Sequence, residues 1–162
     1  MRAALFAVLA VGVVVAPAGA AVLPILHSDY RIGHYRLKTD GTLRSAVLAV
    51  GPPDARIRTG ETCEVRWRTY GMRMTFGGSD PCGPNGRFTR AILVGRSWST
   101  ASRLGIGAPA AAVLEHHPRA FRHLRTEWWW LVRRAGGIGL EAKVHRGRVT
   151  AFRLTVPRQV EQ

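Results

Sequence analysis

Cysteine, carboxylates and long apolar runs are all scarce in this sequence. Cys63 and Cys82 are the only two cysteines, and a zinc site would need two further ligands at suitable spacing, which are not found near them. No segment after residue 20 is apolar for long enough to cross a membrane. No cysteine follows the amino-terminal apolar run, which argues against lipid attachment there.

Motifs that are typical of enzymes and of nucleic-acid-binding proteins are also missing. The segment 95–99 (Gly-Arg-Ser-Trp-Ser) lacks the final glycine of a nucleophile elbow, and no two carboxylates sit in matching motifs of a glycoside hydrolase. No recognisable nucleic-acid-binding motif is present. We therefore expect no catalytic residue and no cofactor, and we consider nucleic acid an unlikely partner class.

Six histidines leave one alternative open. His116 and His117 lie at the end of a predicted helix, His123 follows six residues later, and His27 or His34 would complete a set of ligands. None has the HExxH or Cys-x-x-Cys framing that makes a metal prediction specific, and histidine at a helix end also complements the dipole. We expect no metal. A secreted hydrolase of a wall polymer, with a site near His116 and His117, is the alternative function.

The first twenty residues match a secretory signal peptide. A positive start at Arg2 precedes a short apolar run, and Ala18-Gly19-Ala20 has the small-x-small pattern of a cleavage site. We expect cleavage after Ala20 or one residue later, and the alternative is a retained membrane anchor. The predicted organisation is a signal peptide at 1–20 and a single secreted domain at 21–162, long enough to bury a core.

Positive charge dominates what remains. The 24 arginines and lysines, of which only two are lysine, face ten carboxylates and give a net charge of +14, or +13 once Arg2 is removed. Such a charge attracts anionic partners outside the cell, including acidic wall polymers, lipid headgroups and acidic proteins. The alternative is that the arginine excess reflects GC-rich coding and serves only solubility.

The two cysteines predict one disulfide. In an exported chain, Cys63 and Cys82 are separated by turn-forming sequence and would close a loop around a hairpin. Such a bond contributes roughly 3 kcal/mol by restricting the unfolded chain.

Hydrophobic spacing predicts two helices and several strands. Leu43, Val47 and Val50 recur at helical spacing and are ended by Gly51, and a second helix is predicted between Pro109 and Pro118. A short edge strand is predicted within 27–38. Longer strands are predicted over the ranges 63–67, 72–76, 88–94, 128–132, 138–144 and 152–156.

The order of these elements repeats along the chain. At an offset of 66 residues Gly41 falls on Gly107 and Pro52 on Pro118, and the offset changes by two residues at a turn near 134–137. Duplication explains the match, and chance similarity of two generic units is the alternative. The predicted fold is α+β: two tandem α-β-β-β units, at about 30–95 and 98–157, forming one antiparallel sheet with both short helices on one face.

Three consecutive tryptophans suggest a binding surface. Because strand side chains alternate, Trp129 and Leu131 share one face, and Trp128, Trp130 and Val132 share the other. The repeat places Trp129 and Leu131 over the apolar positions of the first half, so we expect the second set to face outward. Exposed indoles are uncommon without a use.

The other outward positions complete a predicted binding face on the uncovered side of the sheet. Tryptophan and arginine often carry the binding energy of interfaces. The expected partner is an extracytoplasmic protein or an anionic envelope polymer. The alternative is that the amino-terminal segment or a partner subunit covers this side. The predicted binding residues are Trp128, Trp130, Arg66, Arg68, Arg73, Lys143 and Arg153, with Glu64 and Glu141 among them.

These motifs also carry a resemblance. Two helix-plus-hairpin units, with Gly51-Pro52 ending the first helix and Trp67 after the paired cysteine, resemble the β-lactamase inhibitor proteins and the small lipoprotein of the outer-membrane assembly machinery. Uncharacterised secreted proteins of Gram-positive bacteria are similar through Trp98, Thr100, Gly107, Pro118, Trp129, Leu131 and Gly147. The inhibitor family implies a concave, aromatic-lined sheet that grips a protein. The single cysteine pair and the positive charge depart from that family, so no inhibitory residue is carried over.

Overall fold

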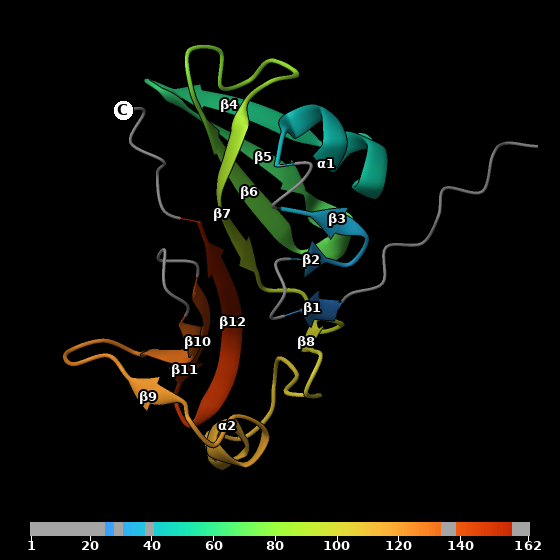
Figure 1. The fold of residues 1–162 in the computed structure, drawn as a ribbon. Helices are drawn as coiled ribbons and strands as arrows, with labels where there is room; N and C mark the ends of the chain where they lie inside the picture. The colour runs from blue at the N-terminus through green and yellow to red at the C-terminus, as the bar shows by residue number, and fades with distance from the viewer. Residues whose placement is uncertain (1–24, 28–30, 38–40, 134–138, 157–162) are drawn as a thin grey trace, which may run out of the picture.

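The computed structural model describes residues 25–27, 31–37, 41–133 and 139–156 (Figure 1). The predicted signal peptide at 1–20 and the predicted turn at 134–137 lie outside the described residues. Neither α-helix in these ranges has the length and apolar content needed to cross a bilayer.

Strands form most of the regular secondary structure in the described residues. The sequence of elements is β1 (Ile25–His27), β2 (Arg31–Ile32), β3 (Tyr35–Arg36), α1 (Leu43–Val50), β4 (Ala55–Thr59), β5 (Thr62–Trp67), the 3-10 helix η1 (Arg68–Tyr70), β6 (Met72–Gly77), β7 (Arg87–Leu93), β8 (Ser99–Thr100), α2 (Ala111–His116), β9 (Phe121–Arg122), β10 (Trp128–Arg133), β11 (Gly139–His145) and β12 (Arg148–Thr155). They form a four-stranded sheet in the order β3-β2-β1-β8 and an eight-stranded sheet in the order β4-β5-β6-β7-β12-β11-β10-β9.

The prediction of an α+β fold with one sheet was therefore wrong. The chain is mostly β and has two sheets, and its α-helices are only eight and six residues long. One short strand was predicted within 27–38, where β2 and β3 lie, but the second sheet was not predicted, because strands of two or three residues are too short for alternation to show their pairing. In β4 four of five residues are exposed, so this strand has no apolar face to detect.

The strand order of the large sheet is symmetric about the β7–β12 pair. Each α-helix is followed by four strands, one more than predicted, and β4 and β9 occupy the two edges. Every pairing in this sheet is antiparallel. The two halves are therefore joined at the middle of the sheet, and duplication of an ancestral unit stays a prediction.

The core lies on one face of the large sheet, under the small sheet and α1. Cross-strand pairing aligns one apolar row through Trp67, Met72, Leu93, Phe152, Ala142 and Trp129. The buried ring of Tyr35 in β3 meets Phe88 of β7 edge to face at 6.1 Å between centroids, and its hydroxyl donates to the Thr42 carbonyl at 3.2 Å. Figure 1 shows β2 and β3 beside α1, and these contacts fix them on the core side.

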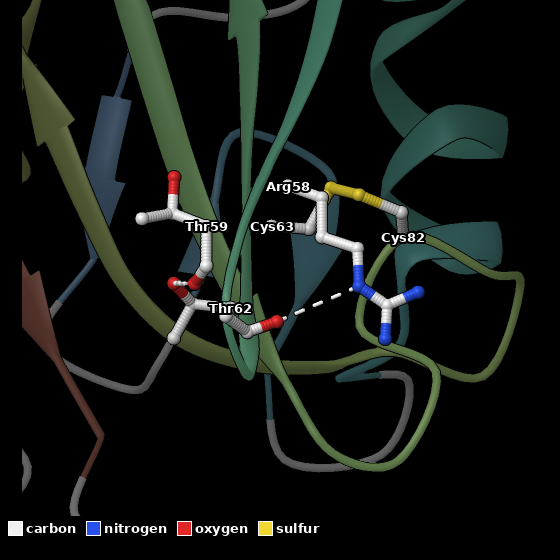
Figure 2. Close-up of a disulfide and its surroundings, with 6 residues drawn as sticks. Arg58, Thr59, Thr62, Cys63 and Cys82 are labelled. Atoms are coloured by element: carbon white, nitrogen blue, oxygen red, sulfur yellow. Dashed lines mark hydrogen bonds between the residues drawn. A yellow bond between two sulfur atoms is a disulfide. The ribbon is translucent and has the colours of Figure 1, made fainter.

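The predicted disulfide between Cys63 and Cys82 is confirmed, and it ties the β6–β7 loop to β5 (Figure 2). The same loop caps α1: the Leu43 N–H donates to the Gly86 carbonyl at 2.9 Å, and the Arg44 N–H donates to Pro84 at 3.0 Å. Helix amino termini leave such N–H groups without partners inside the helix, so the loop satisfies them from outside. The disulfide thus holds the loop that holds the start of α1.

Replacing both Cys63 and Cys82 by serine should lower the free energy of unfolding by about 3 kcal/mol, because the unfolded chain is no longer cross-linked across a sequence separation of 19. Urea unfolding followed by circular dichroism measures this loss. Dithiothreitol should destabilise the wild type by a similar amount and leave the double variant unchanged. Equal stability of the oxidised wild type and the variant would contradict the prediction.

Candidate functional site

The face of the large sheet opposite the core is called here the outer face. Residues directly opposite each other in an antiparallel pair point to the same side, so the pairing register defines its rows. The central row crosses all eight strands through Ala55, Arg66, Arg73, Ile92, Arg153, Glu141, Trp130 and Phe121. A neighbouring row contains Ile57, Glu64, Thr75, Arg90, Thr155, Gly139 and Arg133. On the other side of the central row lie Ala151, Lys143 and Trp128.

The three tryptophans divide between the two sides of the sheet. Trp129 pairs with Ala142 and packs against the core, whereas Trp128 and Trp130 pair with Lys143 and Glu141 on the outer face. All three indoles are half-buried.

Val132 departs from the predicted alternation. A register shift between Trp130 and Val132 places Val132 opposite Leu140, where it packs against the core, as its neighbour Leu131 also does. The prediction that Val132 shares the side of Trp128 and Trp130 was wrong. A β-bulge adds a residue to one strand, and no periodic pattern in the sequence marks where this happens.

A buried carboxylate organises this part of the outer face. Glu141 is only 1% exposed and receives two hydrogen bonds from the Arg153 guanidinium: one from Nε to Oε2, the other from Nη2 to Oε1 at 2.6 Å. His123 Nε2 donates to the same Oε1 at 2.9 Å. Arg153 also lies over the Trp128 ring, with Cζ at 4.1 Å from its centroid. A buried charge is costly without such partners, and here the cation is itself held by an indole.

Trp130 is enclosed by three neighbours. The His123 ring stacks on it at 4.8 Å with an interplanar angle of 24°, and the Arg133 guanidinium lies 5.7 Å from its centroid. A Cβ at Gly139 would come within 1.9 Å of Trp130 Cζ3, so the indole fits only because this position in β11 is glycine. The two indoles predicted to anchor a partner, Trp128 and Trp130, are therefore both in contact with other side chains of this chain, which hold them in place.

Sequence reasoning missed His123, Arg133 and Gly139 as parts of this cluster. Strict alternation places Arg133 on the core side, and only the bulge between Trp130 and Val132 brings it to the outer face. His123 comes from the segment just after β9, and its 18-residue separation from Glu141 carries no periodic signal. The outward placement of Glu141, by contrast, follows from alternation alone.

The remaining predicted binding residues are distributed unevenly. Arg66 pairs with Glu64 at 2.6 Å in a partly exposed ion pair, and Lys143 lies 3.3 Å from Glu127. Arg68 is not on the outer face, because β5 ends at Trp67 and Arg68 begins η1.

Glu127 marks the rim of the outer face beside β11. His145 Nδ1 donates to it at 2.5 Å, and this hydrogen bond, followed by the one from Lys143, holds the pKa of the Glu127 carboxyl below its usual value. Glu127 is therefore ionised at neutral pH and partly neutralises Lys143.

Two outer-face arginines differ from the others. Arg73 and Arg90 are exposed and form no ion pair within the described part of the chain, and unlike Arg133, which also lacks an ion pair there, neither lies over an aromatic ring in that part. Arg73 lies in register between Arg66 and Ile92, and Arg90 lies between Thr75 and Thr155, so none of the residues directly opposite them carries a negative charge. These two guanidinium groups face solvent without compensation.

The histidines near α2 have a separate role. His117 Nε2 lies 2.7 Å from the Ser102 hydroxyl and 3.2 Å from the Thr100 hydroxyl, which links the end of α2 to the turn after β8. Burial lowers the pKa of His117, and the neighbouring His116 lowers it further, so the neutral ring is favoured at neutral pH. Within the described residues His117 has no carboxylate partner to orient it, and no three potential metal ligands of the His, Cys, Asp or Glu type come together. His123 belongs to the Glu141 cluster instead.

No protein-family model matches the chain, and no curated protein sequence matches it significantly. Among solved structures, an extracellular protein containing an SCP domain from Bacillus anthracis str. Ames aligns with a TM-score of 0.44 at 10% identity, over 72% of this chain and 43% of its own. A DUF4309 family protein from Bacillus subtilis subsp. subtilis str. 168 aligns with a TM-score of 0.44 at 13% identity, over 74% of this chain and 80% of its own. The chain thus spans less than half of the first neighbour. The resemblance to the β-lactamase inhibitor proteins stays a prediction.

Replacing Glu141 by glutamine should lower the free energy of unfolding by about 3 kcal/mol, because Arg153 loses the charge that compensates it in a buried setting. The matched control is Glu64→Gln, which removes a carboxylate from a more exposed arginine pair on the same face and should cost less than about 1 kcal/mol. Urea unfolding of both variants gives the two values. Equal costs would contradict the special role assigned to Glu141.

The lowered pKa of His117 predicts a pH dependence of stability. The folded state favours the neutral ring, so the stability contributed by His117 is complete above its unfolded pKa of 6.5 and is lost as the pH falls below it. The difference in unfolding free energy between the wild type and a His117→Gln variant should therefore grow between pH 5 and pH 7.5, roughly the range in which histidine titrates. Parallel profiles for the two proteins would refute the assignment.

Proposed function

We propose that this chain is a non-catalytic extracytoplasmic binding protein, whose outer face binds an anionic partner. The observation that carries the proposal is the pair of exposed, uncompensated arginines, Arg73 and Arg90, in the middle of that face. They lie beside a rigid cluster of indoles and cations that needs no partner to stay in place. The strand backbone fixes where both arginines are attached, so a bound anion would have to order only their side chains.

An extracytoplasmic location is supported by two features. The amino terminus matches a signal peptide, and the disulfide between Cys63 and Cys82 is the kind of bond that persists in oxidising compartments.

Between the two predicted partner classes, the geometry favours an acidic envelope polymer over a protein. The cationic groups lie on neighbouring strands, and neighbouring strands of a sheet are about 4.8 Å apart. Such spacing suits a partner with closely repeated negative charges. Two surface hollows occur elsewhere: one lies against α1, the other around the end of β5, and neither includes an outer-face residue.

The alternative of a hydrolase near His116 and His117 has less support. Ser102 and His117 are within hydrogen-bonding distance, but Thr100 shares the same ring nitrogen. A nucleophile–base pair also needs a group that orients the base, and the described residues supply no carboxylate for this purpose. The contact is better explained as a link between α2 and the β8 turn.

Reversing the charge at both Arg73 and Arg90 to glutamate should weaken binding to an acidic wall polymer such as teichoic acid about 30-fold, roughly 2 kcal/mol for two exposed contacts. Isothermal titration calorimetry at about 0.1 M salt measures the change, because exposed charges are screened at higher ionic strength. The double variant Arg96→Glu and Arg119→Glu is the matched control, since it changes the net charge equally at two exposed arginines outside the sheet.

Equal losses in the two double variants would mean that net charge alone attracts the polymer, and the proposed face would be abandoned. If the protein binds neither teichoic acid nor other acidic polymers but captures an acidic protein, the partner of the outer face is a protein and the polymer proposal is wrong.

A further inference from the structure

The edge strand β4 has unused hydrogen-bonding capacity. It pairs only with β5 among the described strands, in an unbroken register from Ala55 with Arg66 to Thr59 with Thr62. In an antiparallel pair, every second residue directs its peptide N–H and C=O away from the partner strand. Four of the five residues are exposed, and none is a proline or part of a bulge that would block another strand.

An apolar hollow adjoins this edge on the core side of the sheet. It measures about 220 Å³ and is lined by Leu43, Arg44, Val47, Leu48, Arg56 and Pro84. Leu48 on α1 lines the hollow and is 79% exposed, so this apolar wall is open to solvent. The hollow is smaller than the 300–1,000 Å³ or so that is typical of small-molecule sites, and it suits a single apolar side chain.

Arginines surround both features. Arg56 and Arg58 pair with Val65 and Cys63, so their side chains point to the same side as the hollow. Figure 2 shows the Arg58 side chain beside the disulfide, with its Nε directed to the Gly60 carbonyl at 3.5 Å. Arg44 completes the group from α1.

The carboxylates nearest along the chain do not neutralise these arginines. Asp54, which precedes β4, accepts a hydrogen bond from the Arg68 N–H at 2.6 Å, and the described residues form no ion pair with Arg44, Arg56 or Arg58. The edge therefore carries several positive charges beside an apolar depression.

This combination decides between possible occupants. A second copy of the chain pairing through β4 would bring Arg56 and Arg58 against their own counterparts, and like charges across a strand pair are destabilising. An acidic extended segment has the opposite charge. Every second side chain of such a segment would point to the side of the hollow. On that side, acidic side chains would contact the arginines, and an apolar side chain that lies between two acidic ones in the peptide would enter the hollow.

We propose that β4 is a docking edge for an extended acidic peptide of another protein, which adds to the large sheet as a further strand. The backbone of the peptide pairs with β4, an aliphatic side chain enters the hollow beside Leu48, and flanking carboxylates contact Arg56 and Arg58. Backbone pairing supplies affinity, and the hollow and the arginines supply specificity, as in other cases of strand addition. This edge is separate from the outer face proposed above for polymers.

The test uses a fluorescein-labelled heptapeptide, capped at both ends, with threonine at odd positions and Glu, Leu and Glu at positions two, four and six. Fluorescence anisotropy with the purified protein should show saturable binding. A peptide with N-methyl groups on alternate residues keeps the charge but loses several backbone hydrogen bonds, and it should bind at least about 30-fold more weakly. A peptide with lysine in place of glutamate should not bind.

Variants of the protein separate the parts of the site. Leu48→Glu should weaken binding of the acidic peptide about tenfold, while Leu114→Glu on α2, a matched change at another exposed helical leucine, should have no effect. Arg56→Glu combined with Arg58→Glu should weaken it by a similar or larger factor, and Arg96→Glu combined with Arg119→Glu should not. Arg73→Glu combined with Arg90→Glu should leave peptide binding unchanged, which keeps this test independent of the polymer proposal.

Several outcomes would overturn the proposal. These are no binding up to about 1 mM peptide, equal binding of the N-methylated peptide, or equal effects of Leu48→Glu and Leu114→Glu. A dimer in sedimentation that dissociates on Leu48→Glu substitution would assign the edge to a second copy of the chain instead.

Discussion

The antiparallel ladder between β7 and β12 is the interaction on which the rest of the architecture depends. It pairs Leu93 with Phe152 on the core side and Ile92 with Arg153 on the outer side, and thereby joins two four-stranded halves into one sheet. Without this ladder each half would expose a central strand and half of an apolar row. With it, side chains from Arg66 to Trp130 align across the molecule, so a surface that neither half contains by itself is created.

The outer face shows how electrostatic cost shapes such a surface. Glu141 is almost fully buried, and its charge is tolerated because Arg153 and His123 bind it from two directions. The indoles of Trp128 and Trp130 then hold these partners in place. The tryptophans that first suggest a binding surface thus stabilise the Glu141 cluster. In the proposed function, the groups that contact a partner are Arg73 of β6 and Arg90 of β7. In the proposed function, rigidity and recognition are therefore divided between the two halves of the sheet.

The two edges of the large sheet are unlike each other. β9 is only two residues long, and a short strand offers little backbone for pairing. β4 is longer, regular and exposed, and its arginines discourage pairing with another copy of the chain while leaving it open to an acidic strand. This asymmetry is the main departure from the symmetric strand order, and it follows from residues that differ between the halves.

Local rules were sufficient for much of this protein. Alternation located β5, β6, β11 and β12, and the strand propensity of the tryptophan run located β10. A strand was also predicted at β7, and the spacing of apolar residues with glycine and proline stops located both α-helices. The pairing of Cys63 with Cys82 followed from there being only two cysteines in a chain with a predicted export signal. The outward direction of Glu141 needed only the two-residue period of a strand, whereas the inward direction of Trp129 also needed the repeat, because alternation alone does not say which face is buried.

Other features were decided by tertiary structure. The strands of the small sheet and β9 are too short to have a periodic signature, and they exist because partners far away in the chain complete their hydrogen bonds. The bulge that turns Val132 inward, the glycine at 139 that accommodates an indole, and the approach of His123 to Glu141 all depend on contacts between separate strands. A sequence determines which side chains a strand presents to each side, because that is local geometry. Which of those side chains become enclosed and which remain free for a partner is decided only when distant segments pack together, because burial is a property of the assembled sheet.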